Sequence, residues 1–460
     1  VIIFSRSSWN PNIMPFFALL SVYSVWKIWK EEKYKWFIVL GISYAFCLQS
    51  HYLGLLLLPT LGIFLLLKYF EVRKEKLQTI EFKEVVDTFR KHFLIPKDTA
   101  IRVLLGTVFA NKLEADMVWM FLVGAPSSLK SELIQSMRMC PEVEMVTTIT
   151  PQTLVSGYKS KEDVSLLNIL NNRVMAIKDF TTTLNMMQAA RDAIFGQLRD
   201  IYDGQTDKFY GHGEHKRIRV KFGLIAGVTP AIEKLGILQQ TLGERFLRYT
   251  VPSLKKESSE LAACEMVLNS IGKETSNREE VCLAVKRFIG THKFQKPVVP
   301  QNIKNIIFSL GRFTARMRGF VERDYWGNIL YKPGSEGPYR LVKQLAQLAM
   351  GIAILENKPE VTMDEMEILK DVVKSTCPGR IEAVVKTLYF SNGVPLQLKA
   401  ISEIANFPTS TIKVVLEDLI QVRVATKKSI SVGSSYYTLN EDIKKLIQIG
   451  CLYSGNKISI

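Results

Sequence analysis

The sequence predicts an α/β fold for most of the chain, with an all-α membrane segment before it and a small domain of helices and a β-hairpin after it. Three observations support this prediction. The apolar segment 117–124 runs directly into a loop and a helix-forming segment, as a buried strand of a parallel sheet does. Two further apolar segments, 172–182 and 218–230, end in polar residues. The first 67 residues contain two long uncharged runs.

Composition limits the partners and the compartment. The chain of 460 residues is long enough for two to four domains. Its formal net charge of +16 favours a partner that carries phosphates, without choosing between nucleic acid and anionic lipid. None of the six cysteines shares a metal-type or redox spacing with another, which predicts reduced thiols in the cytosol. Because the sequence begins with Val inside an apolar run, we expect a longer reading frame upstream.

The N-terminal residues 1–70 are predicted to cross a membrane about three times. Ser7–Trp26 is one uncharged run, and the run 36–67 is longer than one helix needs for a hydrocarbon core of ~30 Å. We therefore expect two short spans in the second run, Trp36–Leu48 and Tyr52–Leu67. This hairpin places the flanking basic clusters on the same side of the bilayer, as the positive-inside rule prefers. The alternative is a buried helix pair in a soluble domain.

The segment 80–255 is expected to hold a phosphate-binding loop. The sequence GAPSSLKS follows the first apolar strand and precedes a helix, which is the context that such a loop requires. Glycine allows the turn, backbone amides point at phosphate oxygens, the lysine supplies a charge and the final serine a hydroxyl for Mg²⁺. The predicted cofactors are ATP and Mg²⁺. We expect nucleotide contacts from Gly124, Ser127, Ser128, Lys130 and Ser131.

Polar residues at the ends of the next two strands complete the predicted site. Asp179 ends the second apolar segment, where a Walker B carboxylate lies beside Mg²⁺ and the attacking water. We therefore expect Ser131 and Asp179 to be the protein ligands of Mg²⁺. Thr229 ends the third segment and is a candidate sensor of the γ-phosphate.

The ordered set of motifs resembles the AAA+ ATPases, and within them the minichromosome-maintenance (MCM) helicases. LGERFLRY at 242–249 is similar to their arginine-finger motif LLSRFDL, and PYRLVKQL is similar to their lid segment T-x-R-Q-L-E. These helicases also accept a residue other than glycine before the P-loop lysine, where Leu129 stands here. The resemblance implies an ATP-dependent, DNA-associated homo-oligomeric ring. It assigns Arg245 or Arg248 to a finger that reaches a neighbouring subunit's nucleotide, and Arg340, in a helical lid over 256–375, to the second sensor.

One departure from this family bears on hydrolysis. The family has adjacent Asp and Glu at the end of the second strand, whereas this chain has Lys178 and Asp179. Asp179 can hold the metal or orient water, but is not expected to do both equally well. Active hydrolysis and a nucleotide-gated switch therefore both stay open.

Two segments are candidates for DNA backbone contact. DKFYGHGEHKRIRVKF at 207–222 predicts a β-hairpin, which in MCM-like rings faces the pore; a solvated hairpin without a partner is the alternative. The segment 378–460 resembles a winged-helix domain, with Thr409 or Ser410 as N-cap of its second helix. For this domain, DNA contact and protein docking both stay open. The candidate contact residues are Lys216, Arg217, Arg219, Lys413, Lys427 and Lys428.

The first 75 residues resemble a different family. RSSWNPNIMPFF and LQSHYLGLLLLP look like parts of polytopic glycosyltransferases of the protein-mannosyltransferase type, which use lipid-phosphate sugar donors. The early acidic motif that those enzymes need is missing here. The alternatives to a DNA motor are therefore a glycosyltransferase fragment and a membrane-tethered, ATP-gated regulator. We expect a multi-pass membrane protein with a cytoplasmic ATPase, or a cytoplasmic protein if the two parts do not belong to one natural chain.

Overall fold

The structure is a computed structural model of the 460-residue chain. The chain divides into two compact units, Val1–Thr79 and Ile80–Ile460. The structure describes all residues except 1–13, 32–34, 51–54, 56, 78, 127, 155–165, 210–214, 236–244, 255–256, 320, 331–335, 432–433 and 454–460.

The N-terminal unit consists of α2 (Met14–Glu31), α3 (Trp36–Ser50) and α4 (Leu57–Leu77). They share a small apolar core that includes Ile28 and Leu40. The apolar runs thus predict helices correctly, but in the described ranges no helix combines the length and the apolarity that a membrane crossing needs. α3 begins at the same residue as the expected span Trp36–Leu48 and ends two residues later, whereas α2 and α4 continue into the basic segments that were expected to flank the bilayer.

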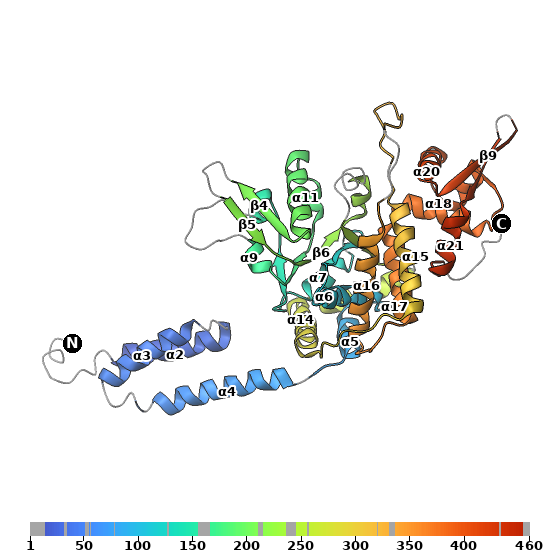
Figure 1. Cartoon of the computed structure of the whole chain (residues 1–460). Helices are drawn as coiled ribbons and strands as arrows, with labels where there is room; N and C mark the ends of the chain where they lie inside the picture. Colours follow the sequence, from blue (N-terminus) through green and yellow to red (C-terminus); the bar gives the residue numbers. More distant parts are fainter. Residues whose placement is uncertain are drawn as a thin grey trace. The chain divides into compact units, whose positions relative to one another are not determined.

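The second unit is built around a parallel sheet, which confirms the predicted α/β class (Figure 1). Its strand order is β2-β3-β6-β1-β7, and every neighbouring pair is parallel. The three expected apolar strands are β1, β3 and β6, whereas β2 and β7 were not expected. The strand bounds are β1 Trp119–Val123, β2 Val143–Val146, β3 Val174–Ile177, β6 Gly223–Val228 and β7 Phe246–Thr250.

Side chains of the sheet alternate between two apolar cores. Met120 and Leu122 of β1 belong to one core, while Trp119 and Phe121 belong to the other, as the two-residue period of a strand requires. The second core lies under four helices: α8 (Pro151–Leu154), α9 (Leu166–Leu170), α10 (Thr181–Leu184) and α11 (Gln188–Tyr202).

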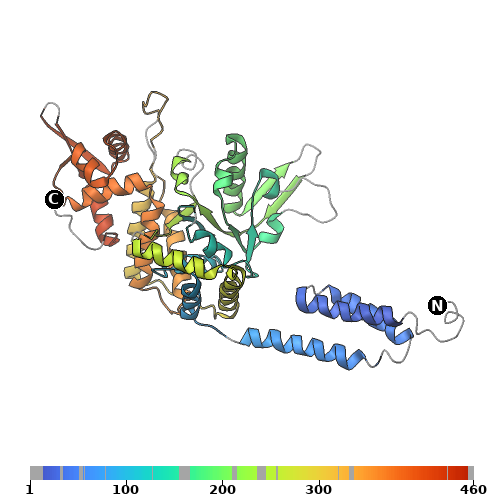
Figure 2. The same cartoon turned by 180° about the vertical axis from the view of Figure 1, so that it is seen from behind.

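The other face of the sheet is covered by a thicker helical layer, drawn mostly in yellow and orange in Figure 2. Two helices near the start of the expected core pack on lid helices, α5 on α14 and α6 on α16. The layer contains α5 (Phe82–His92), α6 (Thr99–Ala110), α7 (Lys130–Gln135), α14 (Glu274–Thr291), α15 (Gln301–Met317), α16 (Tyr339–Ile354) and α17 (Met363–Thr376).

The last part of the chain has the helices and strands expected of a winged helix. Its sheet has the order β8-β10-β9. The N-cap of α20 is Pro408, so the expected capping by Thr409 or Ser410 is wrong, and Thr409 is the first residue of the helix. The bounds are α18 Gly379–Phe390, β8 Leu396–Gln397, α19 Leu398–Ala405, α20 Thr409–Gln421, β9 Ala425–Ser431, β10 Ser434–Leu439 and α21 Glu441–Ile449.

Candidate functional site

The strand order predicts where a ligand would bind. The chain leaves β1 toward β2 at one side of the sheet, and it leaves β6 toward β7 at the other side. Adjacent strands with connections in opposite directions form a topological switch point, and ligands of open parallel sheets bind at the carboxyl ends of the strands there. The loop that begins at Gly124 follows β1, and Thr229 follows β6. Both predicted site residues therefore lie at the switch point.

Backbone hydrogen bonds hold the strand ends together. Gly124 N donates to Val228 O at 3.0 Å, and Phe180 N donates to Gly227 O at 2.8 Å. Thr229 N donates to Thr181 Oγ1 at 3.2 Å. The ends of β1, β6 and β3 thus meet at one edge.

The loop itself has an orphaned polar atom and a buried cation. A Cβ added to Gly124 would lie 2.6 Å from Ser128 Oγ, so the Ser128 side chain would have to move to accept a larger residue there. Ser128 Oγ is buried and has no hydrogen-bond partner within the described ranges. Lys130 is 5% exposed, and its Nζ donates to Ala125 O at 3.0 Å. Burial lowers the Lys130 pKa, and the nearby Asp179 carboxylate partly opposes this effect.

Leu129 does not obstruct the loop. Its φ of −58° is an ordinary helical value, so no left-handed conformation demands glycine there. Its side chain packs against the apolar core. Leu129 in place of the usual glycine is therefore compatible with the backbone and the packing of this loop.

The predicted Mg²⁺ ligands offer a minimal donor set. Asp179 is exposed, and its Oδ1 accepts a hydrogen bond from Thr181 N at 2.9 Å, which leaves the other oxygen for a ligand. Ser131 is half-buried in the first turn of α7. Among the described residues, no group of three or more His, Cys, Asp or Glu side chains could hold a metal. This set fits Mg²⁺ that takes its other ligands from phosphates and water, and it does not fit a cage made by the protein alone.

The predicted arginines lie elsewhere on the sheet. Arg245 precedes Phe246, which pairs with Trp119 at the start of β1. The guanidinium groups of Arg245 and Arg340 lie 5.4 and 5.8 Å from the ring centre of Tyr202. This cluster is therefore at the amino ends of the strands, about 13 Å along β1 from the loop that begins at Gly124.

Both candidate finger residues are buried. Arg245 is 8% exposed and bonds the Asp203 carboxylate at 3.0 Å. Arg248 is 5% exposed within β7. In this conformation neither side chain projects outward from the surface. Arg340 is half-buried and bonds Glu336 at 3.3 Å.

The predicted DNA-contact residues are spread over two hairpins and α20. β4 (Gln205–Phe209) and β5 (His215–Arg219) pair antiparallel, which confirms the expected hairpin. The side chains of Lys216 and Arg217 lie outside the described residues, as Ser127 does entirely. The side chains of Arg219, Lys413, Lys427 and Lys428 are exposed.

Two contacts near the candidate site were not expected. Tyr202 sits between Arg245 and Arg340, and its ring also packs edge-on against Trp119 at 5.0 Å. Arg278 of α14 makes two hydrogen bonds to Glu132 of α7, at 2.8 and 2.9 Å. Neither Tyr202 nor Arg278 belongs to a recognisable sequence motif. Each contacts a residue that lies far away in the chain, so the sequence gives no local signal for these contacts.

Comparison with known proteins adds no assignment. No protein-family model matches the chain, and no curated protein matches it either.

Proposed function

We propose that this chain binds ATP with Mg²⁺ at Gly124–Ser131 and acts as a DNA-associated, ATP-dependent motor or switch. One observation carries the proposal: a buried lysine at the switch point of a parallel sheet, with Asp179 beside it. A buried ammonium group that is held mainly by one carbonyl at 3.0 Å is costly. Phosphate oxygens would supply the missing negative charge.

Each residue would have a defined task in binding. Lys130 would turn from Ala125 O toward the β- and γ-phosphates, and Ser128 Oγ would donate a hydrogen bond to a phosphate oxygen. Bound Mg²⁺ would neutralise phosphate charge, held by Ser131 and Asp179. Thr229, at the adjacent strand end, would contact the terminal phosphate.

The test is a titration of the full chain with a fluorescent ATP analogue. We expect saturable, Mg²⁺-dependent binding that Lys130→Ala abolishes. Lys370→Ala is the matched control, because Lys370 is also a buried lysine, 2% exposed, but lies in α17. Equal binding by the wild type and Lys130→Ala would refute the proposed site.

A switch with slow turnover is the second candidate. Asp179 is the single carboxylate at the end of β3, and one of its oxygens already caps the following turn. Nucleotide binding without measurable release of phosphate would favour this candidate over a motor.

The position of the arginine cluster limits how it could act on a nucleotide. Because Arg245 and Arg340 lie at the opposite edge of the sheet from Lys130, they could only contact a nucleotide held by another copy. A homo-oligomeric ring provides such a neighbour. Arg245 would first have to leave Asp203.

The N-terminal unit carries a separate expectation. Because residues 1–75 resemble mannosyltransferases, a glycosyltransferase fragment remains the prediction for this unit. The acidic motif that glycosyl transfer would need is not in this stretch. A tether for an ATP-gated regulator also remains a prediction. Sequencing across residues 60–90 of the natural gene tests whether the two units belong to one protein.

A further inference from the structure

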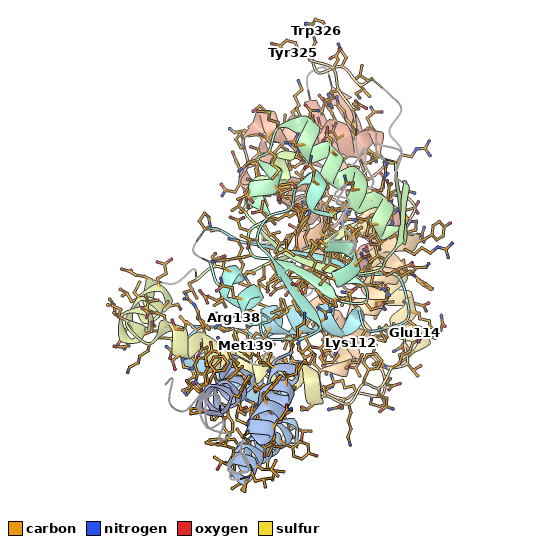
Figure 3. The ribbon with its side chains drawn as sticks, turned by 90° about the vertical axis from the view of Figure 1, so that its left-hand side faces the viewer. Lys112, Glu114, Arg138, Met139, Tyr325 and Trp326 are labelled. Atoms are coloured by element: carbon orange, nitrogen blue, oxygen red, sulfur yellow. The ribbon has the colours of Figure 1, made fainter. Side chains whose placement is uncertain are left out.

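A short hairpin between α15 and α16 presents two aromatic rings to solvent. We name residues 322–330 the aromatic hairpin. Tyr325 is 96% exposed and Trp326 is 82% exposed. Their ring centres are 6.0 Å apart and the planes are nearly perpendicular, at 87°. Figure 3 shows both side chains at an outer tip of the molecule, pointing away from the rest of the chain.

The aromatic hairpin is held in shape by its own hydrogen bonds. Asp324 N donates to Asn328 O at 2.9 Å, and Gly327 N donates to Asp324 O at 3.0 Å. The Asp324 carboxylate accepts from the backbone and the side chain of Asn328 at 2.8 and 2.9 Å. Gly327 has φ +87°, a conformation that favours glycine. The rings are therefore displayed by an ordered turn, which lowers the entropy cost of binding.

The base of the aromatic hairpin is anchored on the winged-helix domain. Arg323 donates to Asp418 of α20 at 2.7 Å and to Glu417 at 3.4 Å. It also donates to Gly327 O at 2.9 Å, inside the turn. One arginine thus connects the turn to the second helix of the helix-turn-helix.

This anchor changes the charge of the surface around the tip. Glu417 and Asp418 are the acidic residues of α20, and Arg323 forms an ion pair with each, so that its charge offsets one of the two negative charges. Lys413 is exposed and lies one helical turn before Glu417, on the same face. Lys427 and Lys428 are exposed on β9, opposite Tyr437 and Tyr436 of β10. Glu417 is close enough to raise the pKa of Tyr437, after the larger effect of burial.

We infer that the aromatic hairpin stacks with unpaired bases of a single-stranded nucleic acid, whose phosphates lie along the lysines of α20 and β9. Single strands expose base faces and phosphates together, and proteins bind them with aromatic side chains beside basic grooves. A duplex keeps its base faces stacked, so it offers no comparable contact. An apolar protein groove would satisfy the rings but not the adjacent cations. The inference deepens the proposed association with DNA.

The experiment measures fluorescence anisotropy of a labelled oligothymidylate of about 20 nucleotides with the full chain, without ATP. We expect Tyr325→Ala/Trp326→Ala to weaken binding by up to about a hundredfold, because stacking of a base on each ring contributes about a tenfold factor in affinity. Tyr325→Leu/Trp326→Leu keeps apolar volume and loses the aromatic faces, so we expect the same loss. Phe308→Ala is the control, since Phe308 is an exposed aromatic, 46% exposed, on α15.

Three outcomes would overturn the inference. These are unchanged oligothymidylate binding by the alanine pair, wild-type binding by the leucine pair, and equal binding of a duplex that depends on the same rings. The first two would point to protein docking.

An oligouridylate arm distinguishes RNA from DNA as the source of the strand. Lys130→Ala should bind the oligonucleotide like the wild type, so failure at the ATP site and failure at the aromatic hairpin are separable.

Discussion

Lys178 and Asp179 are the residues on which the rate of the proposed ATP hydrolysis would depend most directly. Both are exposed at the end of β3, and Gly227 packs so closely on Lys178 O that any Cβ there would overlap it. This contact fixes the backbone at the end of the strand. The side chain of residue 178 can therefore be changed without moving Asp179.

Replacement of Lys178 by aspartate should raise ATP turnover. Lys178→Asp creates adjacent carboxylates, so that one can bind Mg²⁺ while the other orients water. We expect at least about a tenfold increase, equivalent to about 1.4 kcal/mol of barrier, measured as phosphate release at saturating ATP. Lys221→Asp, at an exposed lysine before β6, is the control. An unchanged or lower turnover in Lys178→Asp would argue against this role for Asp179.

At the scale of elements, a close glycine contact joins α6 to α16. Gly351 of α16 lies against Gly106 of α6, and a Cβ at Gly351 would overlap the Gly106 carbonyl oxygen. This contact holds α16, which carries Arg340, against α6, which precedes β1.

Gly351→Ala should destabilise the protein. Overpacking of a tight contact costs about 1–3 kcal/mol, so we expect a lower midpoint of denaturant unfolding. Gly196→Ala in α11 is the control, because a Cβ there meets no atom within 4 Å. That substitution should be neutral or stabilising by up to about 1 kcal/mol. Equal effects of the two substitutions would contradict the close packing.

An ion-pair network near the end of α16 makes stability depend on pH. Burial raises the pKa of Glu356, but hydrogen bonds from Arg102 and Lys358 outweigh it, so that the pKa lies below 4.5. A carboxylate whose pKa is lowered by folding stabilises the protein at pH values above its pKa in the unfolded state. This stabilisation is lost as the pH falls through its pKa in the folded state.

Glu356→Gln should therefore lower the free energy of unfolding at neutral pH by about 1 kcal/mol, a discounted figure because the side chain is 34% exposed. We expect the difference from the wild type to shrink as the pH falls below 4.5. Chemical denaturation at several pH values measures it, with Glu114→Gln at an exposed glutamate as control. A difference that stays constant down to acid pH would exclude the ion pairs as its cause.

Some elements could be predicted from sequence because their signals are local. Continuous apolar runs of β1, β3 and β6, and turn residues around the two hairpins, specify those elements without tertiary information. β7 was not expected as a strand, because FLRYT contains an arginine that only the tertiary packing buries. The arginine cluster around Tyr202 likewise depends on contacts between distant segments. Motif order alone does not tell which edge of the sheet a residue occupies.

At the scale of the whole molecule, the candidate site residues are divided between the two edges of the sheet. Lys130, Asp179 and Thr229 belong to the carboxyl edge, whereas Arg245 and Arg340 belong to the amino edge. A complete site would then need two copies of the chain.

Mixing two inactive variants tests this division. Lys130→Ala and Arg245→Ala should each lose ATP turnover alone. In an equal mixture about a quarter of the interfaces pair an intact loop with an intact arginine, so turnover should return in part. Lys130→Ala mixed with Lys130→Ala/Arg245→Ala is the control and should stay inactive. Absence of any recovery would mean that Arg245 does not act between copies.

The most direct test of the central claim is a structure of the full chain with Mg²⁺ and a slowly hydrolysed ATP analogue. We predict that the triphosphate lies against Gly124–Ser131, with Lys130 Nζ moved from Ala125 O to the phosphates and Asp179 beside the metal. Nucleotide bound at any other place, or Lys130 Nζ still on Ala125 O with nucleotide present, would contradict the claim.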